Sequence, residues 1–257
     1  VYPLFKKFER HHGICEDVEY VPKCLKVSIE EHSEMLALEN LKVSGFEVFD
    51  KTCFLDHDHI SLIFLTYGRF HASSFALRDQ QPEEYEKLVG RFSNVYEKLI
   101  NDETDFYKKL LRTHVTRVMI DCLIPGEDDE IINKFHKYEN DGICRIFEEV
   151  VTDSSDYPAI LHGDCWSNNM INLDYYLKIY YKSFSSFLKK LGSEPEKLFP
   201  FEALKEHWKK YAKFGMIMAL NILQIKMTDK NDFVDFSDRA DSEISDTPPN
   251  VKFDESI

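Results

Sequence analysis

The chain of 257 residues carries 32 Lys and Arg against 46 Asp and Glu, a formal net charge of −14. Its length allows one large domain or two small ones, and its 43% hydrophobic content excludes a wholly disordered chain. The acidity disfavours a nucleic-acid partner, because binding a phosphate backbone requires clustered Lys and Arg. The longest apolar run, residues 216–225, is too short to cross a membrane and contains Asn221, so we expect no membrane span.

The cysteines predict a reducing environment. No two of the six are spaced as C-x-x-C, so neither a zinc ribbon nor a disulfide framework is indicated. No secretory signal opens the chain, and we therefore expect a cytoplasmic location. The first residue is Val1 rather than Met, which suggests a processed product or an incomplete N-terminus. The six residues are Cys15, Cys24, Cys53, Cys122, Cys144 and Cys165.

The first 45 residues predict a short helix and two extended segments. Gly13 ends the helix, whose apolar face consists of Leu4, Phe5 and Phe8. Apolar residues typical of strands predict extended structure over residues 18–27 and 35–41. Gly45 marks a break after the second segment.

Helical periodicity begins at Asp58. An apolar stripe with spacings of three and four residues consists of Ile60, Ile63, Phe64, Tyr67, Phe70, His71 and Phe75. Further helices are expected over residues 82–100, 105–122 and 128–151. Residues 157–171 show little periodicity and predict a structured loop.

Two more helices precede an acidic tail. The apolar face of the first is Leu173, Tyr176, Leu177, Tyr180, Phe184, Phe187, Leu188 and Leu191, with Gly192 as its C-cap. The face of the second is Phe201, Leu204, Trp208, Tyr211, Ala212, Gly215, Ala219 and Ile222. Residues 229–257 carry nine acidic and three basic side chains and include Pro248-Pro249, so we expect a mobile tail.

One segment, residues 161–169, contains the pattern H-x-D-x-x-x-x-N. Phosphoryl transfer uses a carboxylate that accepts the proton of the attacking hydroxyl, and an amide oxygen that holds Mg²⁺ against the phosphates. Asp164 and Asn169, five residues apart on one loop, fit these two roles. The alternative is an Asx-rich turn in which both side chains cap backbone groups.

The other polar candidates favour structural roles. His57-Asp58-His59 suggests a metal site but lacks further spaced ligands, so a cap at a helix start is favoured. His71 lies on an apolar helix face and is expected to be a hydrogen-bonded core histidine. His11-His12 is expected at an exposed helix end. Trp166 suits either a substrate pocket or the packing of its own loop.

Together, several motifs resemble the ecdysteroid-kinase-like family, also called CHK-kinase-like, an insect-rich relative of choline kinases and aminoglycoside phosphotransferases. The resemblance extends from residue 1 to about residue 228. The segments that carry it are His162-Gly163-Asp164 with Trp166 and Asn168-Asn169; Val21-Pro22-Lys23-Cys24; Leu38-Glu39-Asn40-Leu41 and Ser44-Gly45-Phe46; Phe70-His71-Ala72-Ser73-Ser74; Tyr180-Tyr181, Leu191-Gly192 and Pro195-Glu196-Lys197-Leu198.

The resemblance implies a protein-kinase-like fold of the α+β class, mostly α. Residues 1–45 would form a remnant of the N-lobe and the hinge, and residues 46–228 a helical C-lobe with its catalytic loop at 160–171; the tail at 229–257 follows. ATP and Mg²⁺ would be the cofactors. The partner would be a small molecule with a hydroxyl group, ecdysteroids being the substrate class that gives the family its name.

The resemblance also implies the roles of individual residues. Asp164 would be the catalytic base, Asn169 a magnesium ligand, and His162 a structural residue that orients the loop. Glu39 and Leu41 would lie at the hinge, where backbone groups meet adenine. The chain has Glu-Asn-Leu there, where the family usually has Glu-Asp-Leu.

Two departures from the family pattern support an alternative function. The family's glycine-rich strand turn, ATP-phosphate lysine and partner Glu would lie upstream of Val1. The Asp-Phe-Gln triplet whose Asp binds Mg²⁺ would follow the catalytic loop, yet Asn172 leads directly into the helix that begins near Leu173. Because Asn169 is neutral, it cannot replace either charged group. The alternative is therefore an inactive pseudokinase, or an incomplete fragment, that acts by binding.

Overall fold

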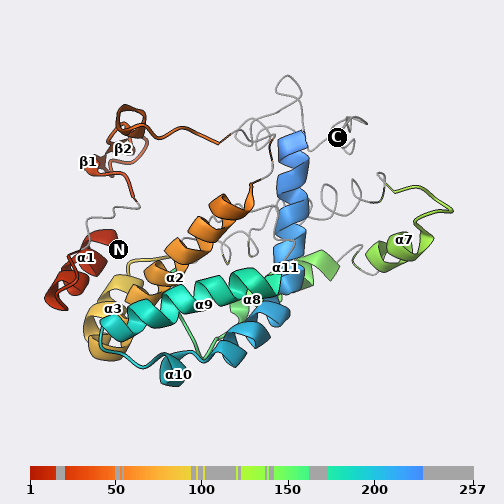
Figure 1. Cartoon of the computed structure of the whole chain (residues 1–257). Helices are drawn as coiled ribbons and strands as arrows, with labels where there is room; N and C mark the ends of the chain where they lie inside the picture. The colour runs from red at the N-terminus through yellow and green to blue at the C-terminus, as the bar shows by residue number, and fades with distance from the viewer. Residues whose placement is uncertain are drawn as a thin grey trace. The chain divides into compact units, whose positions relative to one another are not determined.

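The computed structural model describes residues 1–15, 21–49, 55–93, 123–136, 142–161 and 173–227, with single residues at 53, 97, 101, 120 and 138; the side chains of 173 and 220–227 are not described. The chain divides into two compact units. The first comprises Val1–Val89, Ala159–Leu161 and Ile171–Leu198, and the second Gly90–Pro158, His162–Met170 and Phe199–Ile257. The described elements are mostly helices with one two-stranded sheet, which confirms the predicted α+β, mostly α class (Figure 1).

The first helix, α1 (Tyr2–His11), is amphipathic, and Phe5 and Phe8 are buried on its apolar face. After the helix ends, Gly13 adopts a left-handed conformation with φ of 73°. The predicted helix and its end at this glycine are therefore confirmed.

A β-hairpin follows, formed by β1 (Cys24–Ser28) and β2 (Met35–Leu38), which pair antiparallel. The short 3-10 helix η1 (Leu41–Ser44) comes next and is capped by Gly45, whose φ of 84° only glycine adopts readily. The strands confirm an extended segment in each predicted range, and the break at Gly45 is confirmed as well. The second segment is shorter than predicted, because the strand ends at Leu38 and Leu41 begins η1. The strands' large apolar side chains remain exposed: Leu25, Val27, Met35, Leu36 and Leu38.

The core of the first unit lies between α2 (His57–Gln80) and α9 (Leu173–Lys190), which run side by side (Figure 1). α3 (Pro82–Val89) and the single-turn α10 (Pro195–Leu198) complete this unit. The buried face of α9 is nearly the one predicted, and the described side chains of that face that are buried are Tyr176, Leu177, Tyr180, Phe184, Phe187, Leu188 and Leu191. Gly192 follows with φ of 82°, as a C-capping glycine should.

The backbone of α9 lies very close to Gly68 in the middle of α2. A Cβ at this position would lie 2.6 Å from the carbonyl oxygen of Tyr180 and 2.9 Å from the backbone nitrogen of Phe184. No side chain larger than hydrogen fits there without moving the backbone of α9. The glycine therefore sets the distance between the two helices.

A polar network ties the C-terminal ends of these helices together. The Gln80 amide nitrogen donates to the Leu191 carbonyl at 2.6 Å and to the Ser193 hydroxyl at 2.8 Å, and that hydroxyl donates to Asp79 at 2.7 Å. The Gln80 carbonyl lies 2.8 Å from Nε2 of His12. Because His12 is engaged here, the expectation of an exposed His11-His12 pair holds only for His11.

In the second unit the described helices are α7 (Asp129–His136), α8 (Gly142–Thr152) and α11 (Phe201–Met227). α8 packs on α11 through a small apolar cluster. Its buried members are Ile143, Phe147 and Ile217, flanked by Tyr138, Ile146, Val151, Phe214 and Met218.

Three helix predictions need correction. The helix expected over residues 82–100 ends at Val89, ahead of a turn at Gly90. The helix expected over 128–151 is interrupted, because Tyr138 lies in a turn between α7 and α8. On α11, Ala212 and Gly215 are exposed. The larger side chains of Phe214 and Ile217 pack against α8 instead, since they bury more apolar area.

The remaining predictions are those for the cysteines, for membrane spans and for segments outside the described residues. Among the described residues, Cys15, Cys24, Cys53 and Cys144 form no disulfide, whereas Cys122 and Cys165 lie outside the described part. Of the helices that the structure describes, none has both the length and the apolar composition that a membrane crossing requires. The helix expected over 105–122, apart from residue 120, and the tail at 229–257 also lie outside the described part. The predicted division into N-lobe remnant, C-lobe and tail stays a prediction.

Candidate functional site

Three of the predicted site residues, His162, Asp164 and Asn169, lie outside the described residues, and so does Trp166. The structure describes the segment that leads into this loop, the helix that follows it, and the predicted hinge.

The segment before the loop is anchored on α2. The backbone N–H of Ile160 donates a hydrogen bond of 2.8 Å to the hydroxyl of Ser74, and both residues are buried. Ile160 precedes His162 by two residues. The motif Phe70-His71-Ala72-Ser73-Ser74 therefore ends in the residue that fixes the chain where it enters the predicted catalytic loop.

We expect Ser74→Ala to destabilise the protein by about 1–3 kcal/mol, because the buried N–H of Ile160 loses its acceptor. Amide hydrogen exchange at Ile160 should accelerate at the same time. Denaturant unfolding and exchange of the variant would measure both effects. The matched control is Ser186→Ala on the exposed side of α9, which should change stability by less than about 0.5 kcal/mol. An unchanged exchange rate at Ile160 in Ser74→Ala would contradict the anchoring role.

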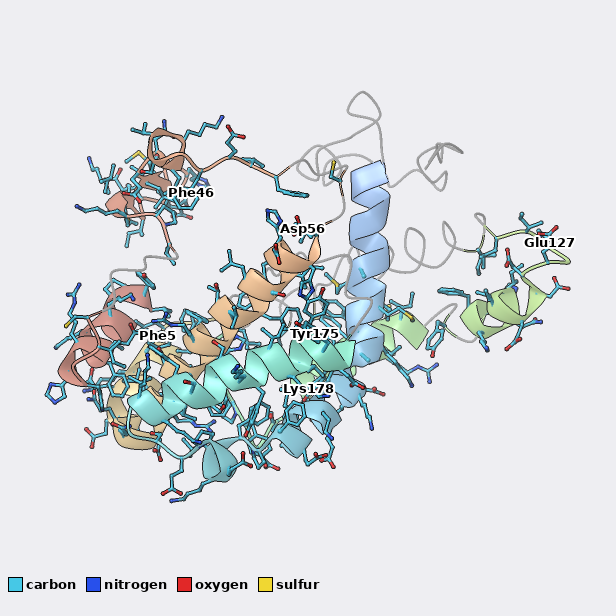
Figure 2. All side chains as sticks on the ribbon, viewed as in Figure 1. Phe5, Phe46, Asp56, Glu127, Tyr175 and Lys178 are labelled. Carbon is cyan, nitrogen blue, oxygen red and sulfur yellow. The ribbon has the colours of Figure 1, made fainter. Side chains whose placement is uncertain are left out.

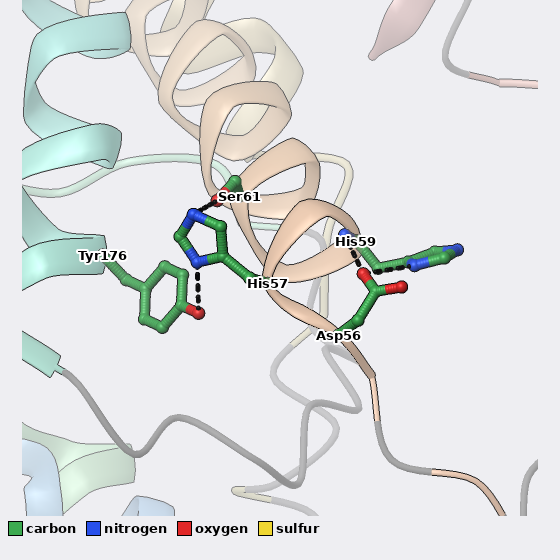
Figure 3. Close-up of polar contacts among 5 residues, drawn as sticks. All are labelled: Asp56, His57, His59, Ser61 and Tyr176. Atoms are coloured by element: carbon green, nitrogen blue, oxygen red, sulfur yellow. Dashed lines mark hydrogen bonds and ion pairs between the residues drawn. The ribbon is translucent and has the colours of Figure 1, made fainter.

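Beyond the loop, the first turn of α9 is tied to the first turn of α2. Nδ1 of His57 lies 3.0 Å from the hydroxyl of Tyr176, and its Nε2 lies 3.5 Å from the hydroxyl of Ser61 (Figure 3). Nε2 also lies 3.5 Å from the hydroxyl of Tyr175, which is labelled in Figure 2. The two longer contacts are at the limit of hydrogen bonding. The imidazole therefore joins the beginnings of two helices by contacts with tyrosine and serine hydroxyls.

The His57-Asp58-His59 motif is a helix start, as predicted, but its cap is the preceding residue. The Asp56 carboxylate accepts from the backbone N–H of His59 at 2.9 Å and lies 2.7 Å from Nδ1 of the same residue (Figure 3). These hydrogen bonds, the backbone bond foremost, lower the pKa of Asp56. Within the described ranges no group of three or more His, Cys, Asp or Glu side chains could hold a metal ion. The histidines serve the helix start.

His71 is a hydrogen-bonded histidine in the α2–α9 interface, as predicted. Its Nδ1 lies 2.8 Å from the Tyr180 hydroxyl, and the ring packs beside those of Tyr67 and Phe70. Burial lowers the pKa of His71 to about 4, because the charged imidazolium loses its hydration. Burial also raises the pKa of Tyr180. At neutral pH this is a neutral pair that holds α2 and α9 together.

Ser73, the residue before the anchor, connects α2 to α1. Its hydroxyl donates a hydrogen bond of 2.8 Å to Glu9, a residue only 7% exposed whose carboxylate is also paired with Lys6 at 3.1 Å. A buried carboxylate needs such partners. Adjacent serines of one motif thus fix α1 on one side and the loop entrance on the other.

The predicted hinge is the two-residue connection between β2 and η1. The N–H of Glu39 donates to the Lys23 carbonyl at 2.9 Å, and the Leu41 carbonyl accepts from the N–H of Phe46 at 3.2 Å. In the described part of the chain, no backbone hydrogen bond uses the carbonyl of Glu39 or the N–H of Leu41. One acceptor and one donor, two residues apart, thus remain available, and adenine presents the complementary donor and acceptor side by side.

The sequence does not predict the structural roles of several of these residues. Gly68 interrupts a strong helical pattern, and a glycine there costs about 1 kcal/mol relative to alanine unless packing requires it. A glycine present in spite of this cost indicates that another helix packs closely against it. The pairings of Ile160 with Ser74, and of Glu9 with Ser73, join residues 86 and 64 positions apart, and no local pattern reveals them.

The structure defines the chain as a mostly helical α+β protein in which α2 and α9 pack side by side, and the H-x-D-x-x-x-x-N segment precedes α9 in the sequence. The sequence model of the ecdysteroid kinase-like family matches residues 1–172. The chain belongs to this family. Neither a curated protein nor a solved structure matches it. The matched residues end one position before α9, so the resemblance expected for residues 173–228 lies outside them.

Proposed function

We propose that this chain has the function of a small-molecule kinase, transferring the γ-phosphate of ATP to a hydroxyl group, with ecdysteroid-like molecules as the substrate class. The observation that carries the proposal is the family match over residues 1–172, which includes the whole H-x-D-x-x-x-x-N segment. The anchoring of Ile160 on Ser74 supports it, because a catalytic loop needs a fixed entrance.

In the proposed mechanism Asp164 accepts the proton of the substrate hydroxyl as its oxygen attacks the γ-phosphorus. Asn169 would hold Mg²⁺ through its amide oxygen, and His162 would orient the loop. ATP would supply the phosphoryl group. The bond between the γ-phosphorus and the bridging oxygen would break, and that oxygen would leave as part of ADP. The carbonyl of Glu39 and the N–H of Leu41 would bind the edge of adenine.

A second candidate, ligand binding without transfer, is favoured by the short interval between the loop and α9. α9 begins at Leu173, four residues after Asn169, and continues as a helix to Lys190. This interval leaves no room for a strand pair that carries a second carboxylate for Mg²⁺. Asn169 is neutral and does not compensate the phosphate charge. On this reading the chain binds a nucleotide or a small molecule and does not turn it over.

The test is phosphate transfer from γ-labelled ATP with Mg²⁺ to an ecdysteroid and to a panel of hydroxylated lipids. For a kinase, Asp164→Asn should lower transfer by about 100-fold or more, because the proton acceptor is lost. The control is Asp174→Asn, which removes an exposed carboxylate at the start of α9 and should leave transfer unchanged.

The same preparation separates the two candidates. Thermal stabilisation by nucleotide or ecdysteroid, without labelled product from any acceptor, would support binding alone. If the protein shows neither transfer nor a ligand-dependent shift in Tm, both candidates are wrong.

A further inference from the structure

A groove with a basic rim lies between α8 and α11 in the second unit, with a volume of about 540 Å³. Apolar side chains of Ile146 and Phe214 contribute to its lining, and Glu149 is the one acidic residue of the lining among the described residues. Its four cations are Arg145, Lys209, Lys210 and Lys213. Because the whole chain has a net charge of −14, this local excess of positive charge predicts an anionic occupant.

Only one of the four cations has an ion-pair partner within the described part of the chain. Lys210 lies 2.7 Å from Asp153, which also accepts a hydrogen bond from Tyr211. The Lys210 hydrogen bond is the main cause of the lowered pKa of Asp153. Arg145, Lys209 and Lys213 are exposed and form no ion pair with another described residue. An occupant with two or three negative charges would satisfy them.

The same chain contains a segment with matching chemistry. Residues 235–243 carry four acidic side chains and one basic side chain, Arg239. The acidic residues are Asp235, Asp238, Asp241 and Glu243. Phe236 adds an aromatic ring that suits the apolar part of the lining. The segment therefore complements the groove in both charge and hydrophobic character.

The length of the connection also fits. α11 is described to Met227, and Lys213 lies 14 residues before it, about 21 Å back along the helix. The eight residues from Met227 to Asp235 span about 26 Å when extended. Asp235 can therefore reach Lys213, and the residues after it can reach Lys209. A tether of this length keeps the segment at an effective concentration in the millimolar range.

We propose that the groove between α8 and α11 binds the acidic segment 235–243 of the same chain. Single exposed ion pairs are weak, so a separate acidic peptide would bind poorly, whereas the tethered segment loses little further entropy on docking. The proposal is independent of whether the chain transfers phosphate.

The experiment is limited trypsin digestion of the full chain, with the initial rate of cleavage after Arg239 measured by mass spectrometry. Docking should protect this bond. The double variant Lys209→Gln/Lys213→Gln should speed the cleavage at least about threefold, because two partners of the segment are lost. The matched control is Lys178→Gln/Lys182→Gln, which makes the same charge change at two exposed positions of α9, of which Figure 2 labels Lys178. This variant should cleave like the unmodified chain.

A reciprocal variant tests the other side of the contact. Asp235→Asn/Glu243→Gln leaves the residues next to the cleaved bond unchanged and should raise the rate similarly. In about 1 M NaCl the Debye length falls to about 3 Å, so variant and unmodified chain should converge to equal rates. The proposal is wrong if the Lys209/Lys213 variant cleaves no faster than the Lys178/Lys182 control at low salt.

Discussion

Gly68→Ala is expected to destabilise the first unit by about 2 kcal/mol or more. Alanine improves helix propensity by about 1 kcal/mol, but its Cβ would lie 2.6 Å from the Tyr180 carbonyl oxygen and 2.9 Å from the Phe184 nitrogen. Both are backbone atoms of α9 and cannot move without shifting the helix. Overpacking of this kind costs about 1–3 kcal/mol, or more where the backbone resists, and here it outweighs the gain in propensity.

The control is Gly215→Ala, the same substitution in the interior of another long helix. Gly215 is exposed on α11, and a Cβ there meets no atom within 4 Å. Without a clash only the propensity term remains, so this variant should be unchanged or stabilised by up to about 1 kcal/mol. Urea denaturation followed by circular dichroism would measure both variants. Equal stability of Gly68→Ala and the unmodified chain would show that α2 and α9 do not pack as closely as described.

The sequence predicts the α2–α9 pair well because large apolar residues repeat there with a helical period over five or more turns. Tyr180, Phe184 and Leu188 of α9 are buried as expected. An apolar pattern that keeps the helical period over many turns leaves few alternatives for which face of the helix is buried. The distance between two such helices depends instead on a residue without a side chain, which a hydrophobic pattern does not register.

The α11 prediction is only partly right for a related reason. Its expected stripe continues through small residues, Ala212 and Gly215, whose burial contributes little free energy. When α8 packs on this helix, Phe214 and Ile217 bury more area and determine the contact face. A weak stripe can thus be overridden by tertiary packing, whereas the strong stripe of α9 is not.

In the candidate site, too, the sequence predicts one part and does not predict another. The spacing of Asp164 and Asn169 indicates phosphoryl transfer chemistry from the sequence alone, and the family match covers both residues. The sequence does not reveal what anchors the described segments on either side of the loop. The anchors at Ser74 and His57 depend on partners 86 and 119 residues away, brought together only by the packing of α2.

The second large effect is a dependence of stability on pH that arises from His71. In the folded protein burial lowers the pKa of its imidazole to about 4, from the usual value of 6.5. Between these values the unfolded chain binds a proton that the folded chain does not. Lowering the pH from 6.5 to 4 therefore favours unfolding, and the loss of stability from this residue approaches about 3 kcal/mol.

His71→Gln isolates this contribution, because an amide can hydrogen-bond the Tyr180 hydroxyl but does not titrate. Free energies of unfolding measured by urea denaturation at intervals between pH 4 and pH 7 should fall less steeply for the variant than for the unmodified chain. Carboxylates that titrate near pH 4 are common to both proteins and cancel in the difference. A constant offset between the two curves reports only the change in packing.

The control substitution is His11→Gln, at an exposed position of α1. Its curve should run parallel to that of the unmodified chain, because no buried histidine is removed. Parallel curves for His71→Gln as well would show that the imidazole in the α2–α9 interface is hydrated when folded. The difference between the His71→Gln and unmodified curves should become constant above about pH 7, where the histidine is largely neutral in both states and the imidazole–tyrosine pair holds the two helices together.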